Sequence, residues 1–196
     1  MILTRENIDK LNKKYAKSER HYTAITVHAE IVNEIAQKIA MNAAIKVDSN
    51  LLEQACRIHD VASSSFMNNS DKDFDYKSYQ LHAILGSAIL LDEGVDPAIA
   101  EMVANHLLIS VSKEDVENYE LRIPVKDYSP TTIEGRILAF ADVFHSKDPK
   151  FNSFESLVEK YQKFAPSQVK KLKDAVAEFG LPDLESLSKK YGHPLV

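Results

Sequence analysis

The stretch Leu51-Leu52-Glu53-Gln54-Ala55-Cys56-Arg57-Ile58-His59-Asp60 decides the fold of this chain. Its apolar residues recur at the three-and-four spacing of an amphipathic helix, and the face turned to the core reads Leu52, Ala55, Cys56 and His59. A histidine therefore lies on a buried face, directly before an aspartate. A buried imidazole beside a carboxylate needs a partner, and a metal ion suits both side chains.

Four further apolar helix faces carry a residue of the same kind. These residues are His28, His82, His106 and Asp142. For any single histidine, a hydrogen-bonded core residue is the more common explanation. An ionised aspartate on a buried face is different, because it must be paired or bound to a cation. If the four histidines and two aspartates converge, they form a ligand set suited to one or two ions such as Fe, Mn or Zn.

Length and composition limit the alternatives. A chain of 196 residues can form one domain with a sizeable core. Its 44% hydrophobic and 27% charged residues are typical of a globular protein and argue against disorder. The net charge of −5 provides no general basic field for a nucleic-acid backbone. A long nucleic-acid substrate is therefore disfavoured.

The sequence also bears on compartment. The single Cys56 cannot form an internal disulfide, and the residues from Met1 to Glu6 lack the apolar core of a secretion signal. No stretch approaches the roughly 20 apolar residues that span a bilayer. We therefore expect a cytoplasmic protein without a membrane partner. We expect Cys56 to fill apolar space in the core. The oligomeric state of the protein stays open.

Helical periodicity dominates the chain and predicts an all-α fold. Thr4, Asp48 or Ser49, Asp96 with Pro97, and Thr131 or Thr132 are the expected helix starts. Residues 63–78 and 110–130 have no clear periodicity and read as irregular. We expect a helical metal-binding domain over residues 1–150 and a short helical extension, 151–196, packed on it.

The order of the polar residues resembles the HD superfamily of metal-dependent phosphohydrolases. The match consists of His28, the doublet His59-Asp60 and the distant Asp142, and it covers roughly residues 20–150. The resemblance implies a helical bundle with one or two divalent ions in its interior. His82 and His106 fall where members with a second ion place further ligands, and Asp60 would then bridge the two ions.

The C-terminal part resembles a subfamily of small, stand-alone HD hydrolases. The similar segments are residues 141–147, 151–154, 179–184 and Tyr191-Gly192-His193-Pro194. Two features depart from better-known relatives. Leu107 follows His106 where di-iron members often have a second histidine, and Val-Ala-Ser-Ser follows the doublet, without a nearby glutamate. His193 is interpreted as structural.

The resemblance implies hydrolysis of a phosphate ester in a small phosphorylated metabolite, a nucleotide being the favoured class. His59 and Asp60 would carry the reaction, because a bound cation lowers the pKa of its water from about 15.7 to about 7. The ion, whether Mn, Fe, Mg, Zn, Co or Ni, is not distinguished. Two alternatives stay open: a non-catalytic ligand-sensing module, which the two departures favour, and a di-iron oxygenase.

Five residues near these ligands are candidates for substrate binding: His21, Lys77, His145, Ser146 and Lys147. His145 and Ser146 come three and four positions after Asp142, so they should flank it on the same helix. For Lys77 and Lys147, a solvated surface charge is the favoured interpretation. For the other three, binding and structural roles are weighed equally.

Overall fold

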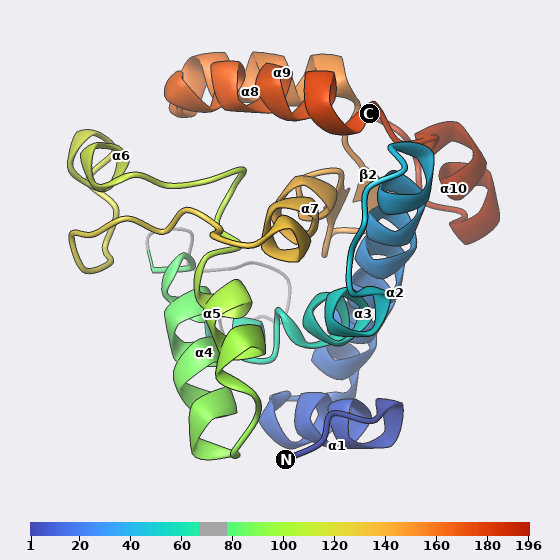
Figure 1. The fold of residues 1–196 in the computed structure, drawn as a ribbon, viewed down its shortest axis with the longest axis vertical. Coiled ribbons are helices and arrows are strands. Elements are labelled where there is room, and N and C mark those ends of the chain that lie inside the picture. Colours follow the sequence, from blue (N-terminus) through green and yellow to red (C-terminus); the bar gives the residue numbers. More distant parts are fainter. Residues whose placement is uncertain (67–77) are drawn as a thin grey trace.

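A computed structural model describes residues 1–66 and 78–196 (Figure 1). It confirms the all-α prediction, with one 3-10 helix at Ser63–Phe66 and a two-stranded antiparallel hairpin beside the α-helices. The elements are α1 (Arg5–Tyr15), α2 (Glu19–Asn42), α3 (Ser49–Ile58), α4 (Leu81–Asp92), α5 (Pro97–Ala104), α6 (Lys113–Asn118), α7 (Ile133–Asp142), β1 (His145–Ser146), β2 (Lys150–Phe151), α8 (Phe154–Phe164), α9 (Ser167–Phe179) and α10 (Leu184–Tyr191).

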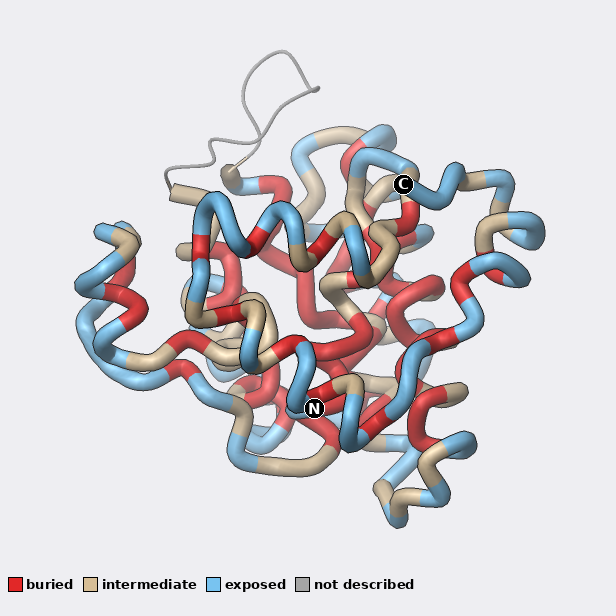
Figure 2. Tube along the Cα trace, turned by 90° about the horizontal axis from the view of Figure 1, so that it is seen from above, coloured by how far each residue is buried: buried red, intermediate tan, exposed pale blue. Residues whose placement is uncertain are grey.

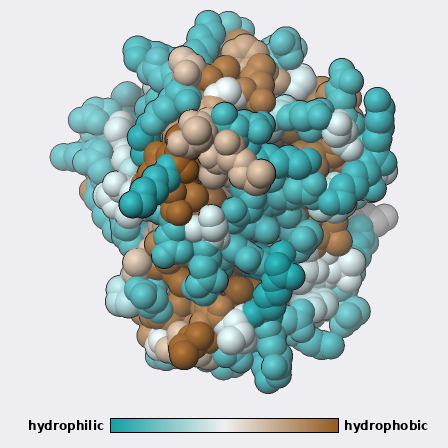
Figure 3. Space-filling view, turned by 45° about the vertical axis from the view of Figure 1, so that its right-hand side comes forward, coloured by the Kyte–Doolittle hydropathy of each residue, from teal (hydrophilic) through white to brown (hydrophobic). Residues whose placement is uncertain are grey.

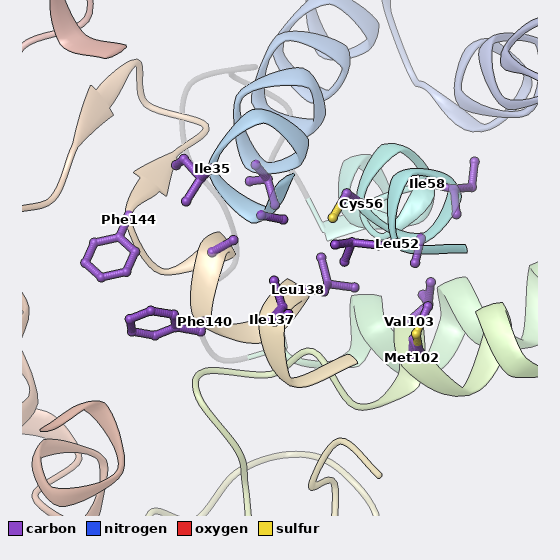
Figure 4. Packing of buried hydrophobic residues seen from close by; sticks show 14 of the residues in the cluster. Ile35, Leu52, Cys56, Ile58, Met102, Val103, Ile137, Leu138, Phe140 and Phe144 are labelled. Carbon is purple, nitrogen blue, oxygen red and sulfur yellow. The ribbon is translucent and has the colours of Figure 1, made fainter. Parts of the chain in front are cut away.

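The helix α2 is the centre of the bundle, and it packs against α3 on one side and α7 on another. Its 24 residues bury one long apolar stripe, which includes Ile31, Val32 and Ile35. Figure 4 shows Leu52 of α3 and Leu138 of α7 close together between these two helices, and Ile35 belongs to the same buried cluster. Figure 2 shows the buried residues gathered along these inner segments. This packing fixes the ends of α3 and α7 next to the middle of α2.

Side-chain caps start the helices where the sequence predicts. Thr4 caps α1, and Asp48 accepts hydrogen bonds from two backbone amides at the start of α3. Asp96 caps α5, with Pro97 as its first residue, and Thr132 caps α7. Because each cap sets the start of its helix, it also fixes where the functional residues at the far end lie.

Two local predictions were wrong, and one element was not predicted. Residues 110–130 contain the short helix α6, which a reciprocal capping box between Ser112 and Asp115 begins. His106 lies two residues beyond the end of α5 rather than on it. The hairpin of β1 and β2 was not predicted, because a strand of two residues is too short to show periodicity.

One glycine permits a close approach that the site depends on. A Cβ atom on Gly86 of α4 would lie 3.1 Å from Cγ1 of Val103 on α5, so a larger residue would press against Val103. His82 lies one turn before Gly86, and His106 lies three residues after Val103. The absence of a side chain at Gly86 therefore lets the two histidines meet.

Helices α8 and α9 lie across the end of the bundle beside α7, and α10 lies beside α2 (Figure 1). Their apolar residues join the same buried cluster as the bundle. The predicted division into a metal-binding domain, residues 1–150, and a helical extension, residues 151–196, stays a prediction. Figure 3 shows a face in which hydrophilic side chains surround separate apolar patches. Within residues 1–66 and 78–196, no helix combines the length and apolar character needed to cross a membrane.

Candidate metal centre

The six predicted metal ligands lie on or just beyond five helices and meet in the interior. His28 lies in the middle of α2, and the other five lie at or near helix ends. His59 and Asp60 directly follow α3, His82 lies in the first turn of α4, His106 lies two residues beyond α5, and Asp142 is the last residue of α7. Their potential ligand atoms form three overlapping groups, each within 4.8 Å: His28, His59 and Asp60; His59, His106 and Asp142; and Asp60, His82 and His106.

Asp60 is the centre of this cluster, and its two carboxylate oxygens face different histidines. Oδ2 lies 3.3 Å from Nε2 of both His28 and His59. Oδ1 lies 3.2 Å from Nε2 of His82 and 4.0 Å from Nε2 of His106. On the first side, Oδ1 of Asp142 lies 2.9 Å from Nε2 of His28. The arrangement is that of a carboxylate shared between two ligand groups.

Backbone carbonyls orient three of the imidazoles. Nδ1 of each ring donates a hydrogen bond to the carbonyl three residues earlier, at 2.6 to 2.7 Å; the three rings are those of His59, His82 and His106. A neutral ring that donates through Nδ1 carries an unprotonated Nε2, which is the form that binds metal. The backbone therefore turns the Nε2 atoms of three rings towards Asp60.

The distances between these nitrogens test whether a cation fits. Nε2 of His82 and Nε2 of His106 lie 2.9 Å apart, and Nε2 of His28 and Nε2 of His59 lie 3.3 Å apart. Two unprotonated nitrogens repel each other at such distances unless a proton or a cation attracts both. The donor set of imidazoles and carboxylates suits a divalent transition metal. The residues present therefore fit such an ion.

The protonation states are close to those that a cation requires. Burial lowers the pKa of His28 to about 4 and that of His106 to about 3, so both rings are neutral at pH 7. Burial also opposes charge on Asp60, but the Lys147 ammonium and His59 outweigh it and hold its pKa well below normal. His59 differs, because the carboxylates of Asp60 and Asp142 overcome burial and raise its pKa to about 10. A cation must displace that proton.

The prediction that Lys147 is a solvated surface charge was wrong. Its side chain is only 11% exposed, and its ammonium contacts Oδ2 of Asp60. It also lies over the ring of Tyr79, 5.5 Å from the centroid, and Tyr79 stacks on His82. Burial opposes its charge, yet Asp60 raises its pKa above the ordinary value. Lys147 therefore places a permanent positive charge inside the cluster.

His145 and Ser146 do not flank Asp142 on a helix, contrary to the prediction. Helix α7 ends at Asp142, and both residues lie on β1, which pairs with β2. The turn still brings Nδ1 of His145 to 2.9 Å from Nδ1 of His28. His193, interpreted from sequence as structural, contacts His145 from the C-terminal segment. No local pattern could reveal this contact, because the two residues are 48 positions apart.

A pocket of about 520 Å³ lies beside the cluster. Its lining combines the start of α2 with the β1 hairpin and the C-terminal segment: Glu19, Arg20, Thr23, Ala24, Val27, His145, Ser146, Lys147, Pro149 and His193. His145 and Lys147 connect the two, since each lines the pocket and also contacts a predicted ligand. His21 is buried and is not among the described lining residues. Lys77 lies outside the described residues.

Cys56 fills apolar space in the core, as predicted. Its side chain is completely buried, and burial raises the pKa of its thiol. Its backbone carbonyl accepts the hydrogen bond from His59. Cys56 therefore supports the site through packing and through its backbone, without a reactive thiolate.

The family model described as HD domain matches residues 26–147, which include all six converging residues. The chain belongs to the HD-domain family. The match begins just before His28 and ends at Lys147, so the hairpin residue that contacts Asp60 lies within this HD domain. Pro149, His193 and the start of α2, which also line the pocket, lie outside the match.

Archaeal proteins are among the relatives of this HD domain. A tRNA (cytidine(56)-2'-O)-methyltransferase of Picrophilus torridus is 31% identical over 88% of the chain, and that of Thermoplasma volcanium is 28% identical over 69%. The chain covers 47% and 36% of those two proteins, less than half of each. An uncharacterized protein of Methanocaldococcus jannaschii is 28% identical over 71% of the chain and 76% of its own length.

Solved structures support the fold. The HD domain of the phosphodiesterase PgpH from L. monocytogenes superposes with a TM-score of 0.55 over 94% of this chain and 98% of that one, at 12% identity. The same domain in complex with cyclic-di-AMP gives a TM-score of 0.52 over 94% and 97%, at 15% identity. At such identities the likeness shows a shared fold.

Proposed function

We propose that this HD domain is a divalent-metal-dependent phosphohydrolase that cleaves a phosphate ester in a small phosphorylated metabolite, with a nucleotide as the favoured class. The observation that carries the proposal is the division of the Asp60 carboxylate, with Oδ2 facing His28 and His59 and Oδ1 facing His82 and His106. A shared carboxylate between two imidazole groups suits two ions as well as one.

Each ligand has a separate part in this proposal. His28, His59, Asp60 and Asp142 would hold the first ion, and His82 and His106, with Asp60, would hold a second. A divalent ion there supplies Lewis acidity, which acidifies a water molecule and neutralises phosphoryl charge. The backbone carbonyls behind the rings keep the ligand nitrogens aimed inward. We leave the identity of the ion open.

The pocket beside the cluster is the proposed substrate site. Its volume of about 520 Å³ is within the range of small-molecule sites, roughly 300–1,000 Å³. Arg20, Ser146 and Lys147 offer charged and hydroxyl groups to a phosphate, whereas Ala24 and Val27 offer an apolar wall to a base or other flat group. His145 also borders this space. Roles for His21 and Lys77 in substrate binding, and a cytoplasmic location, stay predictions.

The relatives bear on substrate class in different ways. The PgpH domain is a phosphodiesterase whose structure holds cyclic-di-AMP, which makes a phosphodiester a candidate alongside a monoester. The two methyltransferases are more than twice as long as the region that matches this chain, and their names describe the reaction of the whole proteins. Methyl transfer is therefore not proposed for this domain.

One observation favours a second candidate, a non-catalytic ligand-binding module. The ammonium of Lys147 already neutralises Asp60, so the cluster has an internal cation. In that case the pocket would bind a phosphorylated ligand without cleaving it. A di-iron oxygenase, the remaining alternative, has no comparable support among the described contacts.

Metal analysis followed by a hydrolysis screen tests these candidates. The purified protein is analysed for bound metals. Phosphate release is then measured from a panel of nucleotides with Mn, Mg, Fe or Co added. For cyclic dinucleotides, a phosphatase is added after the reaction to release phosphate from the cleaved product. We expect bound metal and turnover in the wild type and loss of both in Asp60→Ala. Asp96→Asn, which replaces an exposed helix cap, is the control. Bound ligand without turnover in the wild type would favour the module, and wild-type turnover in Asp60→Ala would refute the role proposed for Asp60.

A further inference from the structure

His28 differs from the other three ligand histidines in what holds its second nitrogen. Nδ1 of His59, His82 and His106 donates to a backbone carbonyl. Nδ1 of His28 lies 2.9 Å from a side-chain nitrogen instead, Nδ1 of His145. The two rings are stacked, with centroids 5.2 Å apart and planes inclined by 24°. The orientation of His28 therefore depends on another side chain.

His145 is in turn held by His193. Nε2 of His145 lies 2.9 Å from Nδ1 of His193, and these rings are also stacked, with an angle of 18° between their planes. The rings of Phe151 and His145 meet in an edge-to-face arrangement, with centroids 4.9 Å apart. His145 is buried, whereas His193 is partly exposed and lines the pocket. Three imidazoles thus form a continuous row from the predicted ligand to the pocket wall.

The C-terminal segment fixes His193 in this row. Ser188 of α10 donates a hydrogen bond from its hydroxyl to the backbone carbonyl of His193 at 2.6 Å. The next residues pair with β2, since the Phe151 amide donates to Pro194 and the Val196 amide donates to Phe151. His193 is therefore held on both sides by backbone and hydroxyl contacts rather than lying on a loose end.

The direction of each hydrogen bond follows from the ligand role of His28. If Nε2 of His28 binds a cation, its proton must be on Nδ1, which then donates to Nδ1 of His145. His145 accepts through Nδ1, so it carries its proton on Nε2 and donates to Nδ1 of His193. His193 ends the row as an acceptor. With a cation on Nε2 of His28, this order lets each neighbouring pair of rings in the row form its hydrogen bond.

We propose that His145 and His193 are positioning residues that fix the tautomer and the ring orientation of His28, so that the C-terminal segment completes the metal centre. This inference rests on the proposed function, because it requires a cation on His28. Partners behind a metal-ligating histidine typically change metal affinity about 10–100-fold. The acceptor at position 193 is therefore expected to control metal binding without contacting the metal.

Cobalt binding tests this role without measuring turnover. Co²⁺ is titrated into the apo-protein, and its affinity is followed by calorimetry and its coordination by the visible absorption spectrum. We expect His193→Ala to bind Co²⁺ about tenfold more weakly, with an altered spectrum. His193→Asn keeps an acceptor near the position of Nδ1, so it should recover most of the affinity and the wild-type spectrum. The melting temperature of each apo-variant checks that α10 and the hairpin remain folded.

The outcomes separate this inference from the proposed function. If the wild type binds no Co²⁺, the metal centre itself is refuted. If the wild type binds it and His193→Ala matches the wild type, only the positioning role is overturned. Equal weakening in His193→Ala and His193→Asn would also overturn it, because the acceptor would then not matter. If His193→Ala unfolds, the Co²⁺ affinity of His193→Asn is compared with that of the wild type instead. A loss of affinity in the folded His193→Asn variant would overturn the acceptor role.

Discussion

The ammonium of Lys147 contacts the carboxylate of Asp60, the residue around which the four histidines of the cluster are arranged. A positive side chain therefore lies on the same oxygen, Oδ2, that faces His28 and His59. A divalent ion bound to these ligands would compete with Lys147 for that oxygen, because both are cations. Removing the Lys147 ammonium should therefore have opposite effects on the stability of the apo-protein and on its metal affinity.

Replacing Lys147 with methionine should destabilise the apo-protein and strengthen metal binding. The loss of the ammonium leaves the buried Asp60 carboxylate without its strongest partner, at a cost of about 3 kcal/mol. The same loss removes the competitor, so Mn²⁺ should bind more tightly and restore more stability than in the wild type. Urea unfolding with and without Mn²⁺, together with calorimetry, measures both effects. Lys150→Met, which removes a more exposed lysine of the same hairpin, is the control; equal Mn²⁺ affinity in wild type and Lys147→Met would contradict the competition.

Replacing Gly86 with valine should destabilise the fold and weaken the second ligand group. The Cβ atom of the new side chain would meet Val103 at 3.1 Å, which is tighter than most such contacts, and overpacking typically costs about 1–3 kcal/mol. The helices α4 and α5 would separate, and His82 would move away from His106. Val103→Ala in the same chain should recover part of the loss. A double-mutant cycle of unfolding free energies measures this coupling, and simple additivity of the two changes would argue against it.

Glu34 should stabilise the C-terminal helix α10 in a pH-dependent manner. Its Oε2 accepts hydrogen bonds from Lys190 at 2.5 Å and from Tyr191 at 2.7 Å. Burial opposes its charge, but these partners and Lys38 lower its pKa to about 2. A carboxylate whose folded pKa is depressed contributes stability above its unfolded pKa of about 4.3, and loses it as the pH falls towards the folded value.

Glu34→Gln should therefore be less stable than the wild type at pH 7, and the difference should shrink between about pH 4.5 and pH 2. Urea unfolding across this range measures the difference. Glu185→Gln, which removes an exposed carboxylate from α10, should show a smaller effect. A difference for Glu34→Gln that stays constant down to pH 2 would show that its charge does not act through Lys190 and Tyr191.

A tryptophan at Val27 should obstruct the substrate pocket. Val27 lines the pocket from α2 and is exposed, so a larger ring would occupy space proposed for the substrate. With a nucleotide that the wild type cleaves, we expect KM to rise about tenfold or more, with metal content unchanged. Val125→Trp, at an exposed position that does not line the pocket, is the control. An unchanged KM in Val27→Trp would mean that the substrate binds elsewhere.

Helix boundaries near the site followed closely from local sequence. Thr4, Asp48, Asp96 and Thr132 cap helices in the structure, because a cap depends on residues two or three positions away. The helix at residues 113–118 carried a capping-box signal of the same kind, which the prediction overlooked. The structure of residues 63–66 is a 3-10 helix, whose short range leaves little periodicity to detect.

By itself, the sequence determined that an all-α protein would bury His28, His59, Asp60, His82 and His106, since each lies on or directly beside an apolar helix face. Only the tertiary structure decided which of these atoms meet. Asp60 receives Lys147 from a hairpin, and His28 receives His145 from 117 positions along the chain. The physical reason is that periodicity records whether a side chain faces the core, whereas its partner there depends on how separate helices and strands pack.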